Sequence, residues 1–200
     1  MCAAPNRKPF DAVAGHYDLF MRLSGLFHDD AIRRLLAAGA GERLVDLAGG
    51  TGHHAALLAD LYREVTVVDE SARMLAQVPR RENIHTVQAD ARQTGLPDAS
   101  FDDALLSDAL HHIEDHEELL REIDRLLRPG GRLLVHDFDP SALRVRVQGF
   151  LERLFFRRPM HFRTPAALQA LCERQGFHLL AVEKHRGFYL LLVGKQHEVR

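Results

Sequence analysis

Short apolar runs alternate with amphipathic stretches along the chain from residue 43 onward. The runs are rich in Val, Leu and Ile, and neither side of each strand is polar enough to face water, which is typical of strands inside a parallel sheet. They predict strands at Arg43–Leu47, Glu64–Asp69, Ile84–Ala89, Phe101–Ser107 and Arg132–Phe138.

The stretches between these runs place apolar residues at helical spacing. Glu114–Leu127 is the longest, and its leucines and isoleucine recur every three or four positions, which predicts a helix with one buried face. Pro129–Gly131 is expected to end this helix and turn the chain into the next strand. The other predicted helices are 30–38, Gly52–Leu61 and Ser71–Gln77. Alternating strands and helices predict a doubly wound α/β fold with helices on both faces.

The pattern changes after Phe138. Helices are predicted at about 141–156 and at Pro165–Arg174, followed by strands at Phe177–Lys184 and Gly187–Gly194. Only a few residues separate these two strands, which is too short a connection for a crossover helix. The last strand must therefore run antiparallel to its neighbour, which places a hairpin in an otherwise parallel sheet.

Length and composition predict one globular domain spanning residues 1–200. Within it we distinguish an N-terminal helical segment (1–40), a core (41–138), and a C-terminal region of helices and a hairpin (139–200). Lys and Arg number 26 against 28 Asp and Glu, and this balance does not favour a nucleic-acid partner. The absence of a signal sequence, the short apolar runs and the two cysteines predict a cytoplasmic protein.

A glycine-rich turn joins the first predicted strand to the following helix. Its residues, 48–52, read Ala-Gly-Gly-Thr-Gly, and the glycines allow the backbone to approach a ligand closely. Asp69 ends the second strand 17 residues after Gly52, where such folds place a carboxylate against ribose hydroxyls. A nucleoside ligand is therefore predicted. Because Gly50–Ala55 also fits G-x-G-x-x-A, a dinucleotide cofactor remains a rival prediction.

Further sequence blocks follow in order. They are Asp90-Ala91, Leu96–Asp102, Asp108–Ile113 and Leu126–Val135. Together with the glycine turn, they resemble the class I S-adenosylmethionine-dependent methyltransferases over about residues 10–194. The resemblance implies a Rossmann-like, mostly parallel seven-stranded sheet with an antiparallel last strand.

Within that family, Leu47–Gly52 is most similar to the ubiquinone and menaquinone C-methyltransferases, as are Phe10–Ala14 and Tyr17-Asp18. The wider family usually has glycine at the position of Ala48. An alanine there is similar to the quinone subgroup. The chain after the fifth strand departs from the quinone enzymes, and Asp108–Ile113 has the form common to small-molecule methyltransferases.

The resemblance implies S-adenosylmethionine as the cofactor. Asp46 would orient the glycine turn and the amino group of the cofactor, and Asp69 would bind the ribose diol. Asp90 and Ala91 would hold the adenine, and Ser107 with Asp108 would border the transferred methyl group. The cofactor-binding candidates are Asp46, Ala48, Gly50, Gly52, Asp69, Glu70, Asp90, Ala91, Ser107 and Tyr17, and the catalytic candidates are His111 and Asp108.

The implied acceptor is a small molecule, such as a quinol-like or other hydrophobic ring compound. His111 either takes a proton from it or packs locally to orient its loop. Asp137, at the end of the fifth strand, either points into the crevice or stabilises a turn. The alternative function is a non-catalytic S-adenosylmethionine-binding module or sensor.

Three further features of the sequence have alternative interpretations. His112 and His116 have a spacing that can bind metal on a helix, but the sequence shows no third ligand, so no metal is predicted. Tyr17 either belongs to a lid over the cofactor or packs on the sheet. The basic and apolar segment 143–158 predicts a substrate cover, a peripheral membrane contact or an exposed helix. The protein is expected to be a monomer or a homodimer.

Overall fold

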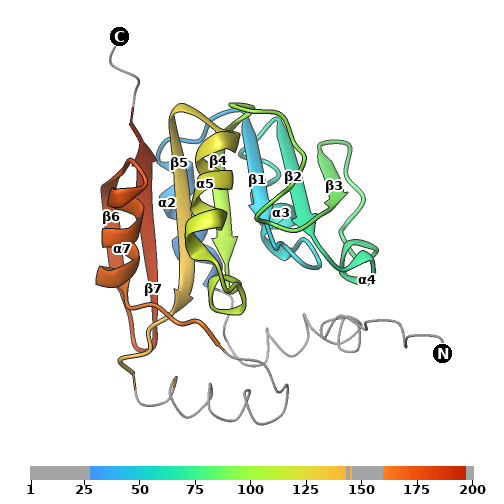
Figure 1. The fold of residues 1–200 in the computed structure, drawn as a ribbon. Coiled ribbons are helices and arrows are strands. Elements are labelled where there is room, and N and C mark those ends of the chain that lie inside the picture. Colours follow the sequence, from blue (N-terminus) through green and yellow to red (C-terminus); the bar gives the residue numbers. More distant parts are fainter. Residues whose placement is uncertain (1–27, 143–144, 146–159, 197–200) are drawn as a thin grey trace, which may run out of the picture.

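The computed structural model describes residues 28–142, 145 and 160–196, which form a seven-stranded sheet in the order β3-β2-β1-β4-β5-β7-β6 (Figure 1). The strands are β1 (Arg43–Leu47), β2 (Glu64–Asp69), β3 (Ile84–Gln88), β4 (Phe101–Ser107), β5 (Leu127–Phe138), β6 (Phe177–Lys184) and β7 (Phe188–Lys195). The helices are α2 (Asp29–Ala37), α3 (His53–Leu58), α4 (Ala72–Leu75), α5 (His116–Leu126) and α7 (Pro165–Arg174), with a short 3-10 turn, η3, at Leu110–His112.

The strands β3, β2, β1, β4 and β5 pair in parallel, and β7 pairs antiparallel with both β5 and β6. The doubly wound fold and the antiparallel last strand are therefore confirmed. Almost every residue of β7 is buried, whereas β6 exposes Leu179, Leu180 and Val182. Burial stabilises a strand most when both of its faces are apolar. The strand β7 therefore occupies the interior position, and β6 lies at the edge of the sheet.

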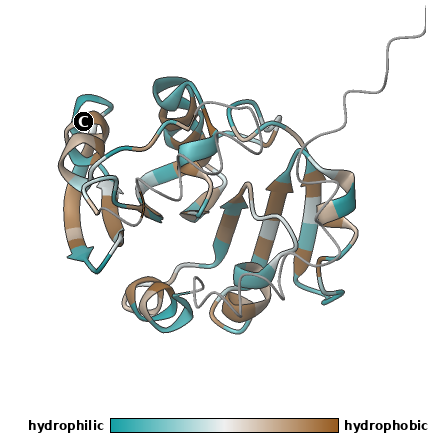
Figure 2. Ribbon diagram, turned by 90° about the horizontal axis from the view of Figure 1, so that it is seen from below, coloured by the Kyte–Doolittle hydropathy of each residue, from teal (hydrophilic) through white to brown (hydrophobic). Residues whose placement is uncertain are grey.

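Helices cover both faces of the sheet. Figure 1 shows α5 and α7 on one face and α2 and α3 on the other, and Figure 2 shows the apolar strands between these layers. Successive residues of β5 alternate between two hydrophobic clusters, because side chains alternate across a strand. Leu133 and Val135 join the cluster under α5 and α7, while Leu134 joins the cluster under α2 and α3.

The junction between α5 and β5 differs from the prediction. The helix ends at Leu126 and the strand begins at Leu127, so Pro129–Gly131 lie within β5 and do not form a separate turn. Leu127 pairs with Phe101, and the register then shifts before Asp103 pairs with Arg132. This irregularity accommodates the Pro-Gly-Gly sequence, since such breaks in pairing take up residues that cannot join a regular ladder.

The predicted boundaries of the other helices are close to those observed, although α3 and α4 are shorter. The predicted helix at 141–156 lies almost wholly outside the described residues. No helix in the described ranges is long and apolar enough to cross a membrane.

A buried ion pair stabilises the amino edge of the sheet. Asp103 on β4 is fully buried and accepts hydrogen bonds from Arg132 Nε at 2.7 Å and from Tyr62 Oη at 2.7 Å. Arg132 also donates to the carbonyl oxygen of Leu36. Burial and the neighbouring carboxylate of Asp103 raise the pKa of Tyr62, so the phenol keeps its proton.

Candidate functional site

The strand order reverses between β1 and β4, since the chain continues from β1 to β2 on one side and from β4 to β5 on the other. Ligands of open α/β sheets bind beyond the carboxyl ends of the strands at such a reversal. The predicted site residues that the structure describes lie at or just after the carboxyl ends of β1, β2, β3 and β4.

The glycine turn after β1 has a tightly constrained backbone. Gly50 and Gly52 have φ angles of 56° and 73°, and Ala48 adopts 53°, a conformation that an alanine rarely takes. A side chain added at Gly49 would meet the carboxylate of Asp46, with its Cβ 2.7 Å from Cγ. The turn therefore requires small residues, and Asp46 lies directly beneath it.

Asp69 fixes this turn to the end of β2. Its carboxylate oxygens accept hydrogen bonds from the backbone N–H of Gly50 at 3.0 Å and of Ser71 at 2.7 Å. These contacts hold the Asp69 carboxylate at the end of β2, beside the glycine turn. Glu70, the next residue, is exposed, and its carbonyl oxygen accepts a hydrogen bond from the Gln88 side chain.

Asp46 is 1% exposed, and within the described residues its Oδ2 atom has no hydrogen-bond partner. Burial and the nearby Asp69 carboxylate raise the pKa of Asp46 to about 7, against the opposing effect of the Ala55 backbone N–H. A buried carboxylate oxygen without a partner is costly in the protein alone, and a cationic ligand group would relieve that cost.

These features fit the cofactor that the sequence resemblance implies. The orphaned oxygen of Asp46 suits an ammonium group, and the glycine turn has backbone where a Cβ would collide with Asp46. Asp69 suits a diol, since a carboxylate accepts the hydrogen bonds of two neighbouring hydroxyls.

Asp90, after β3, is engaged within the protein. It accepts three hydrogen bonds from the Arg92 guanidinium, the shortest at 2.6 Å, and one from the Arg92 backbone N–H at 2.8 Å. The hydrogen bonds that the Arg92 side chain donates to Asp90 raise the pKa of Arg92 against the effect of partial desolvation. Any ligand hydrogen bond to Asp90 would therefore share the carboxylate with Arg92. Ala91, between them, is buried in the hydrophobic core.

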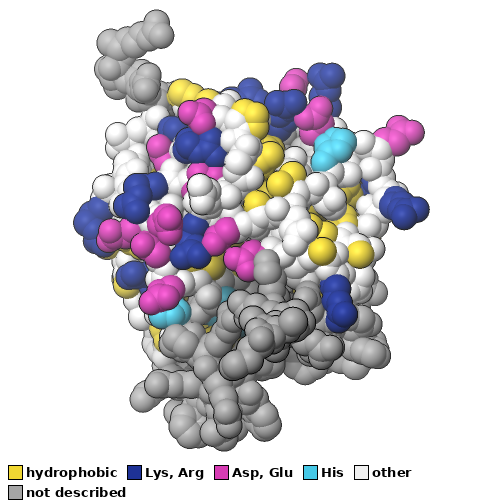
Figure 3. Space-filling view, turned by 45° about the vertical axis from the view of Figure 1, so that its right-hand side comes forward, with side chains coloured by type: hydrophobic (Ala, Val, Ile, Leu, Met, Phe, Trp, Pro, Cys, Tyr) yellow, Lys and Arg dark blue, Asp and Glu magenta, His cyan; other side chains and the backbone are white. Residues whose placement is uncertain are grey.

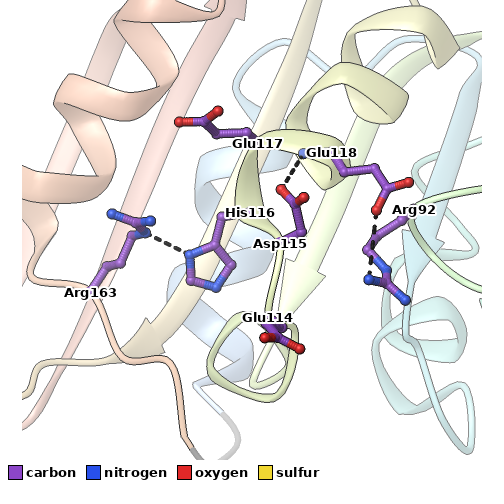
Figure 4. Close-up of a pocket in the computed structure, with 7 residues that line it drawn as sticks. All are labelled: Arg92, Glu114, Asp115, His116, Glu117, Glu118 and Arg163. Carbon is purple, nitrogen blue, oxygen red and sulfur yellow. Dashed lines mark hydrogen bonds and ion pairs between the residues drawn. The ribbon is translucent and has the colours of Figure 1, made fainter.

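A polar cavity of about 450 Å³ lies beside Arg92, at the start of α5 (Figure 4). Arg163 donates to Nδ1 of His116 at 2.5 Å, and Nε2 of the same ring is 3.0 Å from the carbonyl oxygen of Leu110. Both ring nitrogens of His116 are thus engaged within the protein. The cavity is lined by Arg92, Glu114, Asp115, His116, Glu117, Glu118 and Arg163.

Acidic and basic side chains are interspersed on the face shown in Figure 3.

At the carboxyl ends of β4 and β5, His111 of η3 and Asp137 of β5 form a buried pair. His111 Nδ1 lies 2.7 Å from Asp137 Oδ1, and the His111 backbone N–H donates to Oδ2 at 3.0 Å. The Phe162 ring stacks on the imidazole with 5.0 Å between ring centroids. Asp108 belongs to the same group, with a carboxylate oxygen within 4.8 Å of the other two donors. Asp137 therefore fixes the orientation of the His111 ring, as in Asp-His pairs that position a base.

Ser107 belongs to a second buried hydrogen-bonded chain. Its Oγ lies 3.0 Å from His136 Nδ1, and His136 Nε2 lies 2.9 Å from His28 Nδ1. Burial lowers the pKa of His136 to about 3, and the neighbouring His28 and His111 act in the same direction. His136 is therefore neutral at physiological pH, and its ring can relay hydrogen bonds without carrying charge.

The structure brings together Asp46, Gly50 and Asp69 on one side, and Asp108, His111 and Asp137 on the other. Tyr17, the remaining candidate, lies outside the described residues. Sequence reasoning did not single out His28 or Phe162, because nothing in the local pattern shows which distant residue they meet. Ser107 and His136 are in register on adjacent strands, which is the signal that could have linked them.

Comparison with known proteins places these features in context. A family model described as a methyltransferase domain matches residues 45–135. The ubiquinone/menaquinone biosynthesis C-methyltransferase of Rubrivivax gelatinosus is 40% identical over 146 residues, covering 70% of this chain and 58% of that protein. The demethylmenaquinone methyltransferase of Mycobacterium sp. (strain KMS) is 35% identical over 162 residues, covering 79% of this chain and 70% of that protein. The chain thus spans less than two thirds of the length of the first relative.

Solved structures agree on the fold. The S-adenosylmethionine-dependent methyltransferase from Mesorhizobium loti is 25% identical, with a TM-score of 0.72, covering 83% of this chain and 96% of that one. The putative methyltransferase solved in complex with the Haloferax volcanii Trm112 activator is 18% identical, with a TM-score of 0.80, covering 96% of this chain and 99% of that one.

Proposed function

The chain belongs to the S-adenosylmethionine-dependent methyltransferases, and we propose that it transfers a methyl group from that cofactor to a small hydrophobic ring compound of the quinol type. The curated relatives named above are quinone-pathway methyltransferases, which supports this class of acceptor. Membership of the family also excludes the rival prediction of a dinucleotide-dependent dehydrogenase.

The cofactor, when bound, supplies a methyl group on a positively charged sulfur, so the protein has mainly to align the reactants and exclude water. In this proposal Asp46 accepts hydrogen bonds from the amino group and Asp69 from the ribose hydroxyls. Asp90 and Ala91 bind the adenine, and Gly50 and the neighbouring turn residues Ala48 and Gly52 provide close backbone contact. Glu70 and Tyr17 complete the proposed cofactor-binding set.

His111 is the proposed base for the acceptor. Its Nε2 atom takes the proton of a ring hydroxyl, which turns the neighbouring ring carbon into a nucleophile. After this carbon gains the methyl group, it loses its own hydrogen as a proton and the aromatic ring is restored. The imidazolium of His111 returns its proton to the ring oxygen, so the hydroxyl is regenerated and one proton is released overall. Asp137 holds the opposite nitrogen of the His111 ring and stabilises the imidazolium. Asp108 and Ser107 border the methyl group in transit.

The buried His111–Asp137 pair is the observation that carries this proposal. Asp137 is near the carboxyl end of β5, His111 follows β4, and the ring of Phe162 stacks on the imidazole of His111. A histidine oriented by a buried carboxylate, with an aromatic ring stacked on it, supports a catalytic role over that of a non-catalytic binding module.

The test is a methyl-transfer assay with S-adenosylmethionine and a demethylated naphthoquinol kept reduced under anaerobic conditions. Mass spectrometry measures the methylated ring, and chromatography measures S-adenosylhomocysteine. We expect a His111→Gln variant to lower kcat by about 100-fold or more, the usual range for removal of a general base. An Asp137→Asn variant should also lower kcat and shift the pH profile of the reaction.

The matched control is His85→Gln, which changes an exposed histidine on β3, away from the His111–Asp137 pair. This variant should retain the activity of the parent protein. Saturable binding of S-adenosylmethionine without methylation of any hydroquinol would contradict the proposed acceptor and favour the alternative of a binding module. Equal rates in the parent and in His111→Gln would contradict the role of His111 alone.

A further inference from the structure

A second cluster of histidines and a carboxylate lies at the junction of α2 and α3. His53 Nε2 is 2.8 Å from Asp29 Oδ1, and His54 Nε2 is 3.7 Å from the same oxygen. The three donor atoms all lie within 4.8 Å of one another. The two imidazoles meet edge to face, with 5.1 Å between their centroids, so both Nε2 atoms converge on one point near Asp29.

We propose that Asp29, His53 and His54 bind a divalent transition-metal ion of the Zn²⁺ type. Ligand atoms around tetrahedral Zn²⁺ lie 2.0–2.1 Å from the ion and therefore about 3.3–3.4 Å from one another. The observed separations of 2.8 and 3.7 Å from Asp29 to the two histidines bracket that value, so small rotations of the side chains would complete the site.

The donor set selects the kind of ion. Two imidazoles and one carboxylate suit Zn²⁺, Co²⁺ or Ni²⁺, whereas Mg²⁺ and Ca²⁺ prefer sites built from oxygen ligands alone. Metal binding at Nε2 requires each ring to carry its proton on Nδ1.

The location suggests what the ion would do. Asp29 is the first residue of α2, and His53 and His54 are the first residues of α3, which begins directly after Gly52 of the cofactor turn. An ion at this point would join the start of α2 to the start of α3 and so restrain the glycine turn, which ends at Gly52. A metal bound only by the folded chain stabilises it, and this effect does not depend on methyl transfer.

The group Asp108, His111 and Asp137 also brings three potential ligands together, but it belongs to the site already described. His111 Nδ1 lies 2.7 Å from Asp137, as expected for a base held by a carboxylate. The two groups are therefore separate candidates, and variants can distinguish them.

The experiment titrates the tag-free protein, without S-adenosylmethionine, with Co²⁺ followed by visible absorption and with Zn²⁺ followed by calorimetry. We expect one ion per chain, absorption bands of four- or five-coordinate Co²⁺, and a higher Tm with Zn²⁺. Loss of an outer partner of a metal site weakens binding about 10–100-fold, so Asp29→Asn, His53→Gln and His54→Gln should each weaken it at least that much.

Two control variants make the result decisive. His85→Gln removes an exposed histidine far from the cluster and should bind Co²⁺ like the parent protein. His111→Gln tests the other group and should also retain binding. Absence of saturable binding, unchanged affinity in His53→Gln, or loss of binding in His111→Gln would each overturn the proposal. Circular dichroism of each variant shows that the chain remains folded, and His53→Gln is the mildest change because its ring is partly exposed.

Discussion

Two buried aspartates lie on the neighbouring parallel strands β1 and β4, where Asp103 is two residues closer to the amino ends of the strands than Asp46, and their surroundings differ. Asp103 has Arg132 and Tyr62 as partners for its carboxylate. Asp46 has a buried oxygen with no partner among the described residues, and its pKa is raised to about 7.

The difference separates groups that stabilise the fold from groups that await a ligand. A paired buried charge is satisfied by the folded chain itself, and breaking the pair leaves an uncompensated charge. An unsatisfied carboxylate weakens the fold and persists where something else binds to it. Asp103 and its partners therefore stabilise the fold, and the Asp46 carboxylate is available to bind a ligand.

The largest expected effect comes from breaking the pair between Asp103 and Arg132. Asp103→Ala leaves Arg132 buried without its carboxylate and should reduce the free energy of unfolding by about 3–5 kcal/mol, measured by urea denaturation. The folded fraction should bind S-adenosylmethionine with unchanged affinity. The control, Asp60→Ala, breaks the surface pair with Arg33 and should have a much smaller effect, because exposed ion pairs contribute little. Comparable losses in the two variants would remove the distinction between buried and exposed pairs.

The second prediction concerns the pH dependence that Asp46 confers. The native state holds a proton on Asp46 up to about pH 7, whereas the unfolded chain loses it near the ordinary value of 3.8. The contribution of Asp46 to stability is therefore greatest below pH 4 and is lost as the pH rises to about 7, with a total of roughly 4 kcal/mol or less. Asp46→Asn should abolish this contribution. Urea denaturation of both proteins at several pH values measures it, because the difference between their free energies of unfolding should change between pH 4 and pH 7.

The same substitution tests the binding role of Asp46. If the ionised carboxylate meets a cationic amino group, the affinity of the parent protein for S-adenosylmethionine should decline as the pH falls below about 7. Asp46→Asn should bind about 10–100-fold more weakly at pH 8, since hydrogen bonds to charged groups contribute about 1.5–3 kcal/mol. Calorimetric titration across this pH range measures both effects. Equal affinity of the two proteins at pH 8 would show that Asp46 is a structural carboxylate.

A smaller effect is expected for Asp69, which combines both roles. Asp69→Ala removes the acceptor for the backbone N–H groups of Gly50 and Ser71 and, in our proposal, for the ribose diol. We expect a loss of about 1–3 kcal/mol in cofactor binding, with the fold retained. Titration with S-adenosylmethionine measures the affinity, and thermal denaturation checks the fold. Unchanged affinity would contradict the ribose assignment.

The smallest effect is the expected difference in stability between Ala substitutions at two glycines with nearly the same φ angle. Gly52 and Gly95 have φ angles of 73° and 71°, but a Cβ at Gly52 would come 2.9 Å from Val78, whereas nothing lies within 4 Å at Gly95. Both Ala substitutions carry the cost of a left-handed alanine, about 1–2 kcal/mol. Gly52→Ala should lose about 1 kcal/mol more in denaturation experiments, because its neighbour must move. It alone should also weaken cofactor binding.

Much of the fold follows from local pattern. The strands β1, β2 and β4 begin and end where the apolar runs predict, because every second residue on each side must be buried between two helical layers. The hairpin also follows, since the connection between β6 and β7 is too short for a helix. The position of β7 between β5 and β6 cannot be predicted from local pattern. It depends on which of the two strands is stabilised more when both of its faces are buried.

The candidate site shows a similar division. The glycine turn and Asp69 are predictable because strand, turn and carboxylate come in a fixed order along the chain. The pairing of His111 with Asp137 joins residues 26 positions apart, and that of His28 with His136 joins residues 108 apart. Such contacts depend on how η3 and α2 pack against the end of β5, which no local spacing specifies.

The sequence by itself determined the α/β class, the boundaries of β1, β2 and β4, and the family, because these depend on periodicity and on motifs that are contiguous in the chain. Only the tertiary structure decided which buried carboxylate is satisfied and which is not. Asp46 and Asp103 both stand in apolar runs and look alike in the sequence. Their difference arises from partners brought in from other elements, since burial and hydrogen bonding of a side chain are properties of the packed molecule.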